Sequence, residues 1–100
     1  MSVLNLTASN FDDEVAAGKV LVDFWAGWCE PCRMLAPTID AVAADAGERA
    51  KIAKVDIVQE SALAARYKVM SIPTVILFEN GTEIKRFVGV QSKETYLSEL

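Results

Sequence analysis

Two cysteines three residues apart are the side chains of this chain best suited to chemistry. Cys29 follows an apolar run and precedes a helical pattern, and Pro31 fits the first helical turn, where a missing N–H costs nothing. Free N–H groups and the helix dipole at such a position stabilise a thiolate, which is the attacking species in disulfide exchange. The spacing places both sulfurs on one face of the helix, so that Cys32 can attack a mixed disulfide formed on Cys29.

The same pair of cysteines also fits a fixed structural disulfide or two ordinary buried thiols. A disulfide between such close neighbours removes little entropy from the unfolded chain, so a purely structural role gains little. Structural zinc needs about four Cys or His ligands, and the 100 residues contain 2 cysteines and no histidine. Redox chemistry is favoured, the structural disulfide stays open, and no metal is expected.

The elements that would position this pair follow from the apolar pattern. Strands are predicted at Val3–Leu6, Lys19–Ala26, Ala50–Val58, Thr74–Phe78 and Glu83–Gly89. Helices are predicted from a Ser9 cap to Gly18, from Cys29 to about Ala46 with a kink at Pro37, over Glu60–Lys68, and after Ser92. Asn80-Gly81 predicts a hairpin between the last two strands. This order predicts one α/β domain over residues 1–100, with a mixed five-stranded sheet and four helices on both faces.

Composition excludes several classes of function. Apolar residues make up 52% of the chain and charged residues 24%, which is not a disordered composition. The net charge is −4 and no basic run occurs, so nucleic acid is not an expected partner. The apolar runs are too short to cross a membrane, and the start lacks the pattern of a secretory leader. A cytoplasmic monomer without membrane contact is therefore expected.

Four further motifs occur in order along the chain: Val22–Cys32 (VDFWAGWCEPC), Ser71–Thr74 (SIPT), Phe78–Gly81 (FENG) and Val88-Gly89. Together they resemble the thioredoxin family over residues 3–100. The resemblance implies a thioredoxin fold and a protein disulfide reductase in which Cys29 attacks the substrate disulfide and Cys32 resolves the mixed disulfide. It also implies electrons from NADPH through a separate flavoprotein, thioredoxin reductase. The chain has no glycine-rich dinucleotide fingerprint, so it is expected to bind neither cofactor itself.

Asp23 is a carboxylate within an apolar strand, where burial raises the pKa and marks a candidate functional group. The resemblance implies a buried acid or base that serves Cys32 through water. Lys54 on a neighbouring strand is a candidate ion-pair partner, and the resemblance places it at the same site. Ile72-Pro73 alone indicates only a turn before a strand. The resemblance implies a cis proline that faces the cysteines and leaves the preceding backbone free to pair with an extended substrate.

The resemblance further implies an apolar rim around the reactive sulfur that holds an extended segment of a partner protein. Its expected members, with the two residues between the cysteines, are Trp28, Glu30, Pro31, Ile57, Ile72, Pro73, Val88 and Gly89. Without the resemblance, Ile57 and Val88 would be assigned to core packing.

Glu30 departs from the glycine usual in the family. Its charge favours a helix start but disfavours a nearby thiolate, unless exposure and salt screen it. The alternative is a tolerated surface charge.

Two other functions remain open. An oxidase or isomerase would use the same chemistry in the other direction, but the missing leader and the lack of a histidine between the cysteines argue against it. A non-catalytic binding scaffold is the third interpretation, because fold alone does not give function. The presence of both cysteines, Asp23 and Pro73 argues against a scaffold.

Overall fold

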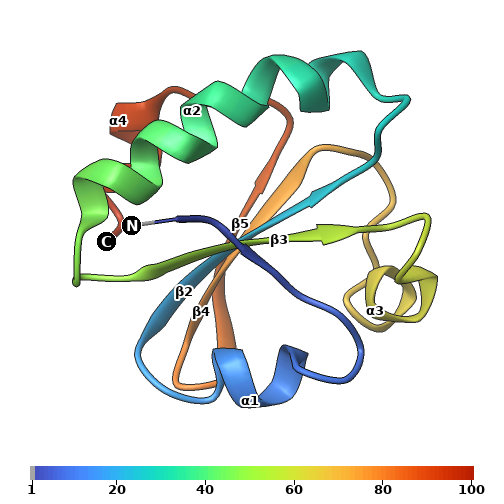
Figure 1. Ribbon diagram of the computed structural model, residues 1–100, viewed down its shortest axis with the longest axis horizontal. Coiled ribbons are helices and arrows are strands. Elements are labelled where there is room, and N and C mark those ends of the chain that lie inside the picture. The colour runs from blue at the N-terminus through green and yellow to red at the C-terminus, as the bar shows by residue number, and fades with distance from the viewer. Residues whose placement is uncertain (1) are drawn as a thin grey trace.

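A single five-stranded sheet forms the centre of the molecule (Figure 1). The computed structural model describes residues 2–100. Its strands are β1 (Leu4–Asn5), β2 (Lys19–Trp25), β3 (Lys51–Asp56), β4 (Thr74–Glu79) and β5 (Thr82–Val88). Its helices are α1 (Phe11–Val15), α2 (Glu30–Ala46), α3 (Ser61–Arg66) and α4 (Lys93–Leu97). Within residues 2–100, no helix is long and apolar enough to cross a bilayer.

The strand order in the sheet is β1-β3-β2-β4-β5. β1 and β2 both run parallel to β3, whereas β4 runs antiparallel to β2 and to β5. Figure 1 shows α2 and α4 on one face of the sheet and α1 and α3 on the other. The predicted mixed sheet with helices on both faces is therefore confirmed.

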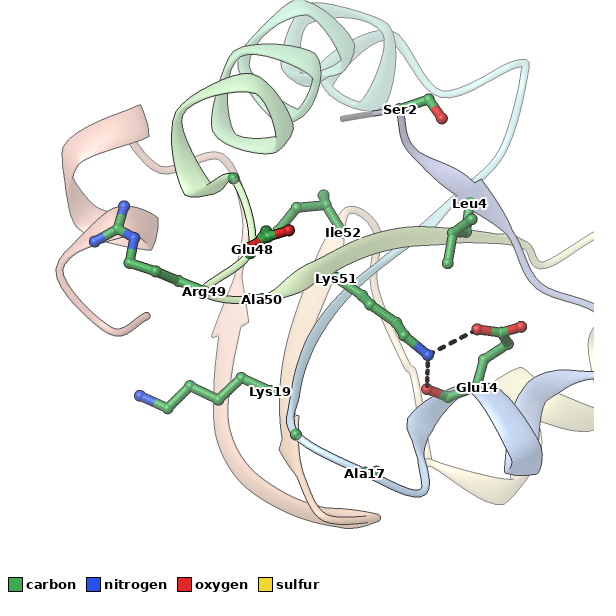
Figure 2. Close-up of a pocket in the computed structure, with 12 residues that line it drawn as sticks. Ser2, Leu4, Glu14, Ala17, Lys19, Glu48, Arg49, Ala50, Lys51 and Ile52 are labelled. Carbon is green, nitrogen blue, oxygen red and sulfur yellow. Dashed lines mark hydrogen bonds and ion pairs between the residues drawn. The ribbon is translucent and has the colours of Figure 1, made fainter.

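The end of the sheet at which β2 and β3 begin carries a hollow of about 610 Å³ (Figure 2). Four of its charged side chains, on Glu14, Lys19, Arg49 and Lys51, already have partners. Lys51 Nζ lies 3.0 Å from Glu14 Oε1 and donates to the Glu14 carbonyl at 3.2 Å, and Lys19 Nζ donates to the Glu99 carbonyl at 3.1 Å. Arg49 donates to the carbonyl groups of Ala46 and Asp45. The cysteines lie beyond the other end of β2. The volume of this hollow is therefore no guide to where the reactive residues lie.

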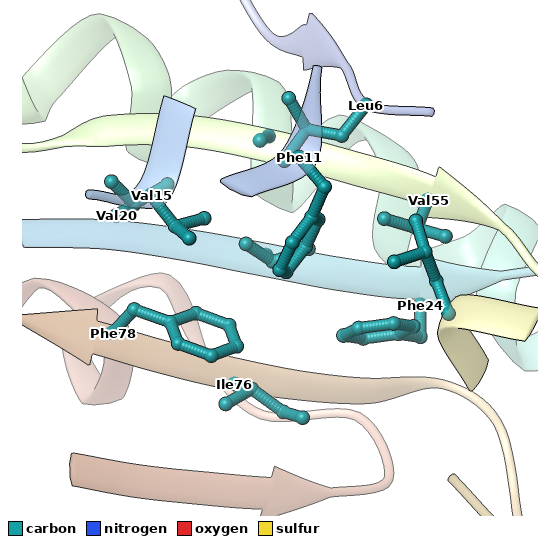
Figure 3. Close-up of a cluster of buried hydrophobic side chains, with 11 residues drawn as sticks. Leu6, Phe11, Val15, Val20, Phe24, Val55, Ile76 and Phe78 are labelled. Atoms are coloured by element: carbon teal, nitrogen blue, oxygen red, sulfur yellow. The ribbon is translucent and has the colours of Figure 1, made fainter. Parts of the chain in front are cut away.

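β2 is the central strand and is buried on both faces, as its near-continuous apolar run predicts. Side chains alternate across a strand. Val20, Val22 and Phe24 accordingly join the cluster beneath α1 and α3, which also contains Phe11 and Phe78 (Figure 3). Leu21 joins the other cluster, with α2 and α4. The same alternation places Asp23 on the face that α2 covers.

The Asn80-Gly81 turn joins β4 to β5 as predicted. Both residues have positive φ, 51° and 83°, as the two central residues of a type I′ hairpin turn require. Asn80 Oδ1 accepts a hydrogen bond from the Gly18 N–H at 2.8 Å, and the Asn80 N–H donates to the Gly18 carbonyl at 2.9 Å. The tip of the hairpin is thereby tied to the loop that leads into β2.

Several predicted boundaries are wrong, among them the end of α1, which is predicted at Gly18 and lies at Val15. Two of the differences have a clear local reason. Ser9 does not cap α1, because Asn10 Oδ1 accepts from the Thr7 N–H at 2.7 Å and the resulting turn delays the helix to Phe11. β3 ends at Asp56 rather than Val58, because Asp56 Oδ1 accepts from the Val58 N–H at 2.9 Å and turns the chain.

Candidate active site

Cys29 and Cys32 form a disulfide at the start of α2, with their Cα atoms 5.2 Å apart. Cys29 is the N-cap residue, and the Cys32 N–H donates to its sulfur at 3.3 Å. Both cysteines are buried, with exposed fractions of 5% and 3%. When the bond is reduced, that N–H and the helix dipole stabilise a Cys29 thiolate.

The chain between β2 and α2 folds so that Cys29 takes this position. The Cys29 N–H donates to the Ala26 carbonyl at 3.1 Å, which closes a turn after the central strand. Cys29 itself is extended, Pro31 stands in the first helical turn, and the Arg33 N–H donates to the Cys29 carbonyl at 3.1 Å. The helix therefore begins directly at the disulfide, as the sequence predicts.

The segment before β4 lies against Cys29. Ile72-Pro73 is a cis peptide, as predicted, and the Ile72 carbonyl oxygen lies 3.8 Å from Cys29 Sγ. Thr74 Oγ1 donates to the Ser71 carbonyl at 2.6 Å, and the Gly89 N–H donates to the Pro73 carbonyl at 2.9 Å. The structure thus brings the predicted Ile72, Pro73 and Gly89 together with the disulfide.

The other predicted rim residues differ in exposure. Ile57 and Ile72 are half-buried and pack against the disulfide, whereas Trp28 and Val88 are 70% and 59% exposed. Val88 pairs with Thr74 at the end of the β4–β5 ladder, so it stands next to Pro73 in the sheet. Sequence analysis missed four further exposed apolar residues, each within two positions of a predicted site residue: Met34, Val58, Met70 and Val90. Their nearness in sequence is the signal that would have found them.

Glu30 is exposed, and its carboxylate has a cationic partner that sequence analysis missed. Arg33 Nη2 lies 3.2 Å from Glu30 Oε2, and Arg33 Nη1 donates to the Gly27 carbonyl at 3.1 Å. The guanidinium thereby bridges the residues on both sides of Cys29. Its charge offsets part of the unfavourable effect of Glu30 on a thiolate. The sequence feature that could have predicted this pair is the i, i+3 spacing of an acidic and a basic residue at a helix start.

Asp23 is 4% exposed, and burial raises its pKa from 3.8 to about 7, against an opposing effect of the Lys54 charge. Its Oδ1 atom has no hydrogen-bond partner among the described residues. A cavity of about 120 Å³ joins it to the second cysteine and is lined by Val3, Asp23, Trp25, Cys32, Arg33, Ala36, Ile39, Asp40 and Lys54. The cavity is mostly apolar but includes charged side chains such as Asp23 and Lys54, and it is large enough for water. Such a water can carry a proton between the carboxyl group and the Cys32 sulfur.

Lys54 is opposite Asp23 in the β2–β3 register, so the predicted adjacency is confirmed. Its Nζ atom lies over the Trp25 ring, 5.3 Å from the ring centre. No ion pair within 4.0 Å joins Lys54 to Asp23 in residues 2–100. Lys54 therefore acts on the carboxyl group through its field rather than through a direct bond.

Disulfide exchange is the chemistry that this arrangement supports. One sulfur accepts an N–H at a helix start and faces an apolar rim, while the other adjoins a buried, titrating carboxyl group. Within residues 2–100, no three His, Cys, Asp or Glu side chains gather as a metal site would need. The fold and the site together define a thiol–disulfide oxidoreductase.

Comparisons with known proteins identify the family. The family model described as Thioredoxin matches residues 2–100. The chain is 46% identical over 94 residues to a thioredoxin of Staphylococcus saprophyticus and to one of Staphylococcus aureus, covering 94% of this chain and 90% of each relative. The solved structure of a mutant thioredoxin from Halobacterium salinarum is 33% identical, with a TM-score of 0.90, over 98% of this chain and 87% of that one. This chain belongs to the thioredoxin family, and its activity is thiol–disulfide oxidoreduction.

Proposed function

We propose that the protein is a disulfide reductase in which Cys29 is the nucleophile and Cys32 the resolving thiol. One observation carries this assignment: the two sulfurs have different surroundings. Cys29 Sγ lies against the Ile72 carbonyl at the rim, whereas Cys32 lines the cavity that contains Asp23. A substrate can reach the first sulfur from the rim, and a proton acceptor serves the second from inside.

The reaction balances as two exchanges. The Cys29 thiolate attacks one sulfur of the substrate disulfide, forms a mixed disulfide and releases the first substrate thiolate. Asp23 then takes the Cys32 proton through water, and the Cys32 thiolate attacks Cys29 Sγ. The second substrate thiolate leaves. Both substrate thiolates are then protonated, one by the proton that Asp23 took from Cys32 and one from solvent, which had received the Cys29 proton. The substrate has gained two electrons and two protons, and the Cys29–Cys32 disulfide has formed.

Substrate binding uses the rim around Cys29. Trp28, Pro31, Ile57, Ile72, Val88 and Gly89 contact an extended segment of the partner protein, with Glu30 at the edge. The Ile72 N–H donates to no protein acceptor within residues 2–100, so the backbone before Pro73 is available to pair with that segment. Disulfide-containing proteins are the substrate class, and their apolar segments suit this surface.

Electrons return to the disulfide from NADPH through a separate flavoprotein, thioredoxin reductase. The protein works in the cytoplasm as a monomer of one domain. Charge and composition support a partner set without nucleic acid or membrane. Lys54 tunes Asp23 from the neighbouring strand.

The reduction potential of the Cys29–Cys32 pair tests the direction of this chemistry. The pair is equilibrated against reduced and oxidised glutathione, and tryptophan fluorescence from Trp25 and Trp28 reports the oxidised fraction. We expect a reduction potential of about −270 mV, as for thioredoxin. A value above about −180 mV would reject the reductase and assign oxidase or isomerase duty.

A further inference from the structure

β5 carries an arginine whose side chain crosses to the end of α3. Arg86 Nη2 donates to the Tyr67 carbonyl at 2.6 Å, and Nη1 donates to the Lys68 carbonyl at 3.4 Å. On its other edge the guanidinium bonds both oxygens of Glu83, at 2.8 and 2.9 Å. The side chains of Arg86 and Glu83 are 29% and 33% exposed, so this pair is more buried than the Glu30–Arg33 pair.

The carbonyl groups that Arg86 reaches belong to a turn in a disfavoured conformation. The Val69 N–H donates to the Ala64 carbonyl at 2.9 Å and the Lys68 N–H to the Ala65 carbonyl at 3.1 Å, which is the pattern of a Schellman helix end. The residue at its left-handed position is Lys68, with φ of 55°, where glycine is usual. A side chain with a Cβ is strained there, so the turn needs support from outside.

This turn begins the segment that ends at the disulfide. From Lys68 the chain runs through Val69, Met70 and Ser71 to Ile72, and Met70 in its middle is 91% exposed. At the far end the residue that follows β5 binds the segment, because the Gly89 N–H donates to the Pro73 carbonyl at 2.9 Å. β5 and the residue after it therefore fix this segment at both ends: Arg86 binds its start, and Gly89 binds Pro73, which follows its end.

We propose that Arg86, oriented by Glu83, is a positioning residue that sets the segment 68–72 and with it the substrate-binding face of the reductase. This inference rests on the proposed function, because it assumes that Ile72 and its neighbours bind substrate. The arginine touches neither sulfur. Its contribution is to hold the backbone before Pro73 at one distance from Cys29, so that a partner segment meets a preformed surface.

Packing alone does not supply the same restraint. The Tyr67 ring lies 5.3 Å from the Phe11 ring and 5.2 Å from the Phe78 ring, so Tyr67 is anchored by its side chain. Lys68 is exposed and Val69 is half-buried. Beyond Tyr67, the Val69 side chain packs against the core cluster, and the backbone hydrogen bonds are those of the turn and of Arg86 until the Ser71 carbonyl accepts from Thr74.

The test compares Arg86→Ala with Lys51→Ala as a matched control. Lys51 also bonds one carboxylate and one backbone carbonyl, on Glu14, but at the other end of the sheet (Figure 2). For reduction of insulin, Arg86→Ala is expected to raise KM about fivefold, equivalent to about 1 kcal/mol, with kcat within about twofold. The rate with oxidised glutathione, which is too small to span the surface, is expected to stay within about twofold. Lys51→Ala is expected to change none of these values.

Two further variants separate positioning from stability. Arg86→Lys keeps the charge but loses the planar fork, so its KM is expected to follow that of Arg86→Ala. Lys68→Gly removes the strain, so adding it to Arg86→Ala is expected to return KM to within about twofold of the wild type. Hydrogen exchange of the amides of residues 68–72 is expected to accelerate in Arg86→Ala and to recover in the double variant.

The outcomes are distinguishable. If the wild-type protein does not reduce insulin, the proposed function fails. If the wild type is active and Arg86→Ala leaves KM unchanged, or Lys51→Ala raises it equally, the positioning role is overturned while the reductase stands. If Arg86→Ala does not fold, Arg86→Lys and its Lys68→Gly double variant carry the same comparison.

Discussion

The two sulfurs of one disulfide lie in opposite environments. Cys29 is at the rim, close to Ile72 and to exposed apolar side chains, and an N–H points at its sulfur. Cys32 is one helical turn further in and adjoins a cavity with a buried carboxyl group. On the proposed mechanism, this difference gives a symmetric bond its direction, because charge is stabilised at one sulfur and a proton acceptor serves the other.

The two environments come from the same strand. β2 ends in the turn that makes Cys29 the N-cap residue of α2, and its alternation sends Asp23 to the face that α2 covers. Helix start and buried acid are thus fixed relative to each other by one stretch of ten residues, 23–32. Substitutions can therefore change one of the two environments and leave the other in place.

Exchanging each sulfur for oxygen is expected to have the largest effect. Cys29→Ser should abolish reduction of a protein disulfide, by more than about a thousandfold, because no nucleophile remains at the rim. Cys32→Ser should still attack and should accumulate a stable mixed disulfide on Cys29, since nothing resolves it. Mass spectrometry of each variant after incubation with substrate checks this. Equal trapping by both variants would show that the two sulfurs are interchangeable.

Removing the buried charge is expected to stabilise the protein in a pH-dependent way. The pKa of Asp23 is raised from 3.8 to about 7 in the folded protein, so the unfolded chain ionises first as the pH rises. Wild-type stability should therefore fall between about pH 4 and pH 7, by up to about 4 kcal/mol. Asp23→Asn should lose this dependence, so its advantage over the wild type should grow over the same range.

Denaturant unfolding of the reduced proteins at pH 4.5 and pH 8 measures that difference. Asp40→Asn is the control, because Asp40 lines the same cavity but is exposed. An advantage of Asp23→Asn that is equal at both pH values would mean that packing, not titration, is the cause.

The resolving step is expected to depend on the same carboxyl group. Asp23→Ala should slow release of the mixed disulfide about tenfold to a hundredfold near pH 7, at the low end of general acid–base catalysis. Attack by Cys29 should change little, because the rim keeps its structure. Single-turnover kinetics between pH 6 and pH 9 separate the two steps. Unchanged release over that range would remove Asp23 from the mechanism.

Local pattern predicted much of this molecule. The Cys29–Cys32 pair at a helix start, the buried central strand and the Asn80-Gly81 hairpin each depend on a few neighbouring residues, and all three are confirmed. The cis peptide before Pro73 needed the family resemblance, because its geometry depends on distant strands.

The sequence did not predict individual side-chain contacts, either between near neighbours or between distant residues. Ser9 does not cap α1, because the neighbouring Asn10 side chain accepts from the Thr7 N–H while the Ser9 hydroxyl bonds the Thr7 hydroxyl. The sequence pattern does not show which of two adjacent polar residues will shape the turn before a helix. The bonds from Arg86 to the carbonyl groups of Tyr67 and Lys68 span 19 and 18 residues, and nothing local marks them. Exposed Met34 and Met70 look like core residues until the sheet and helix define which sides face water.

The smallest expected effect concerns Glu30, which bears on the Cys29 side alone. Glu30→Gly removes a negative charge near the sulfur and should raise the thiolate fraction, but Arg33 already offsets part of that charge. The rate of Cys29 alkylation by iodoacetamide at pH 6 should therefore rise by no more than about twofold. Arg33→Ala, which leaves Glu30 unopposed, should lower the same rate by a similar factor. If both variants alkylate at the wild-type rate, across low and high salt, Glu30 is a tolerated surface charge and the asymmetry between the sulfurs comes from the helix start and Asp23 alone.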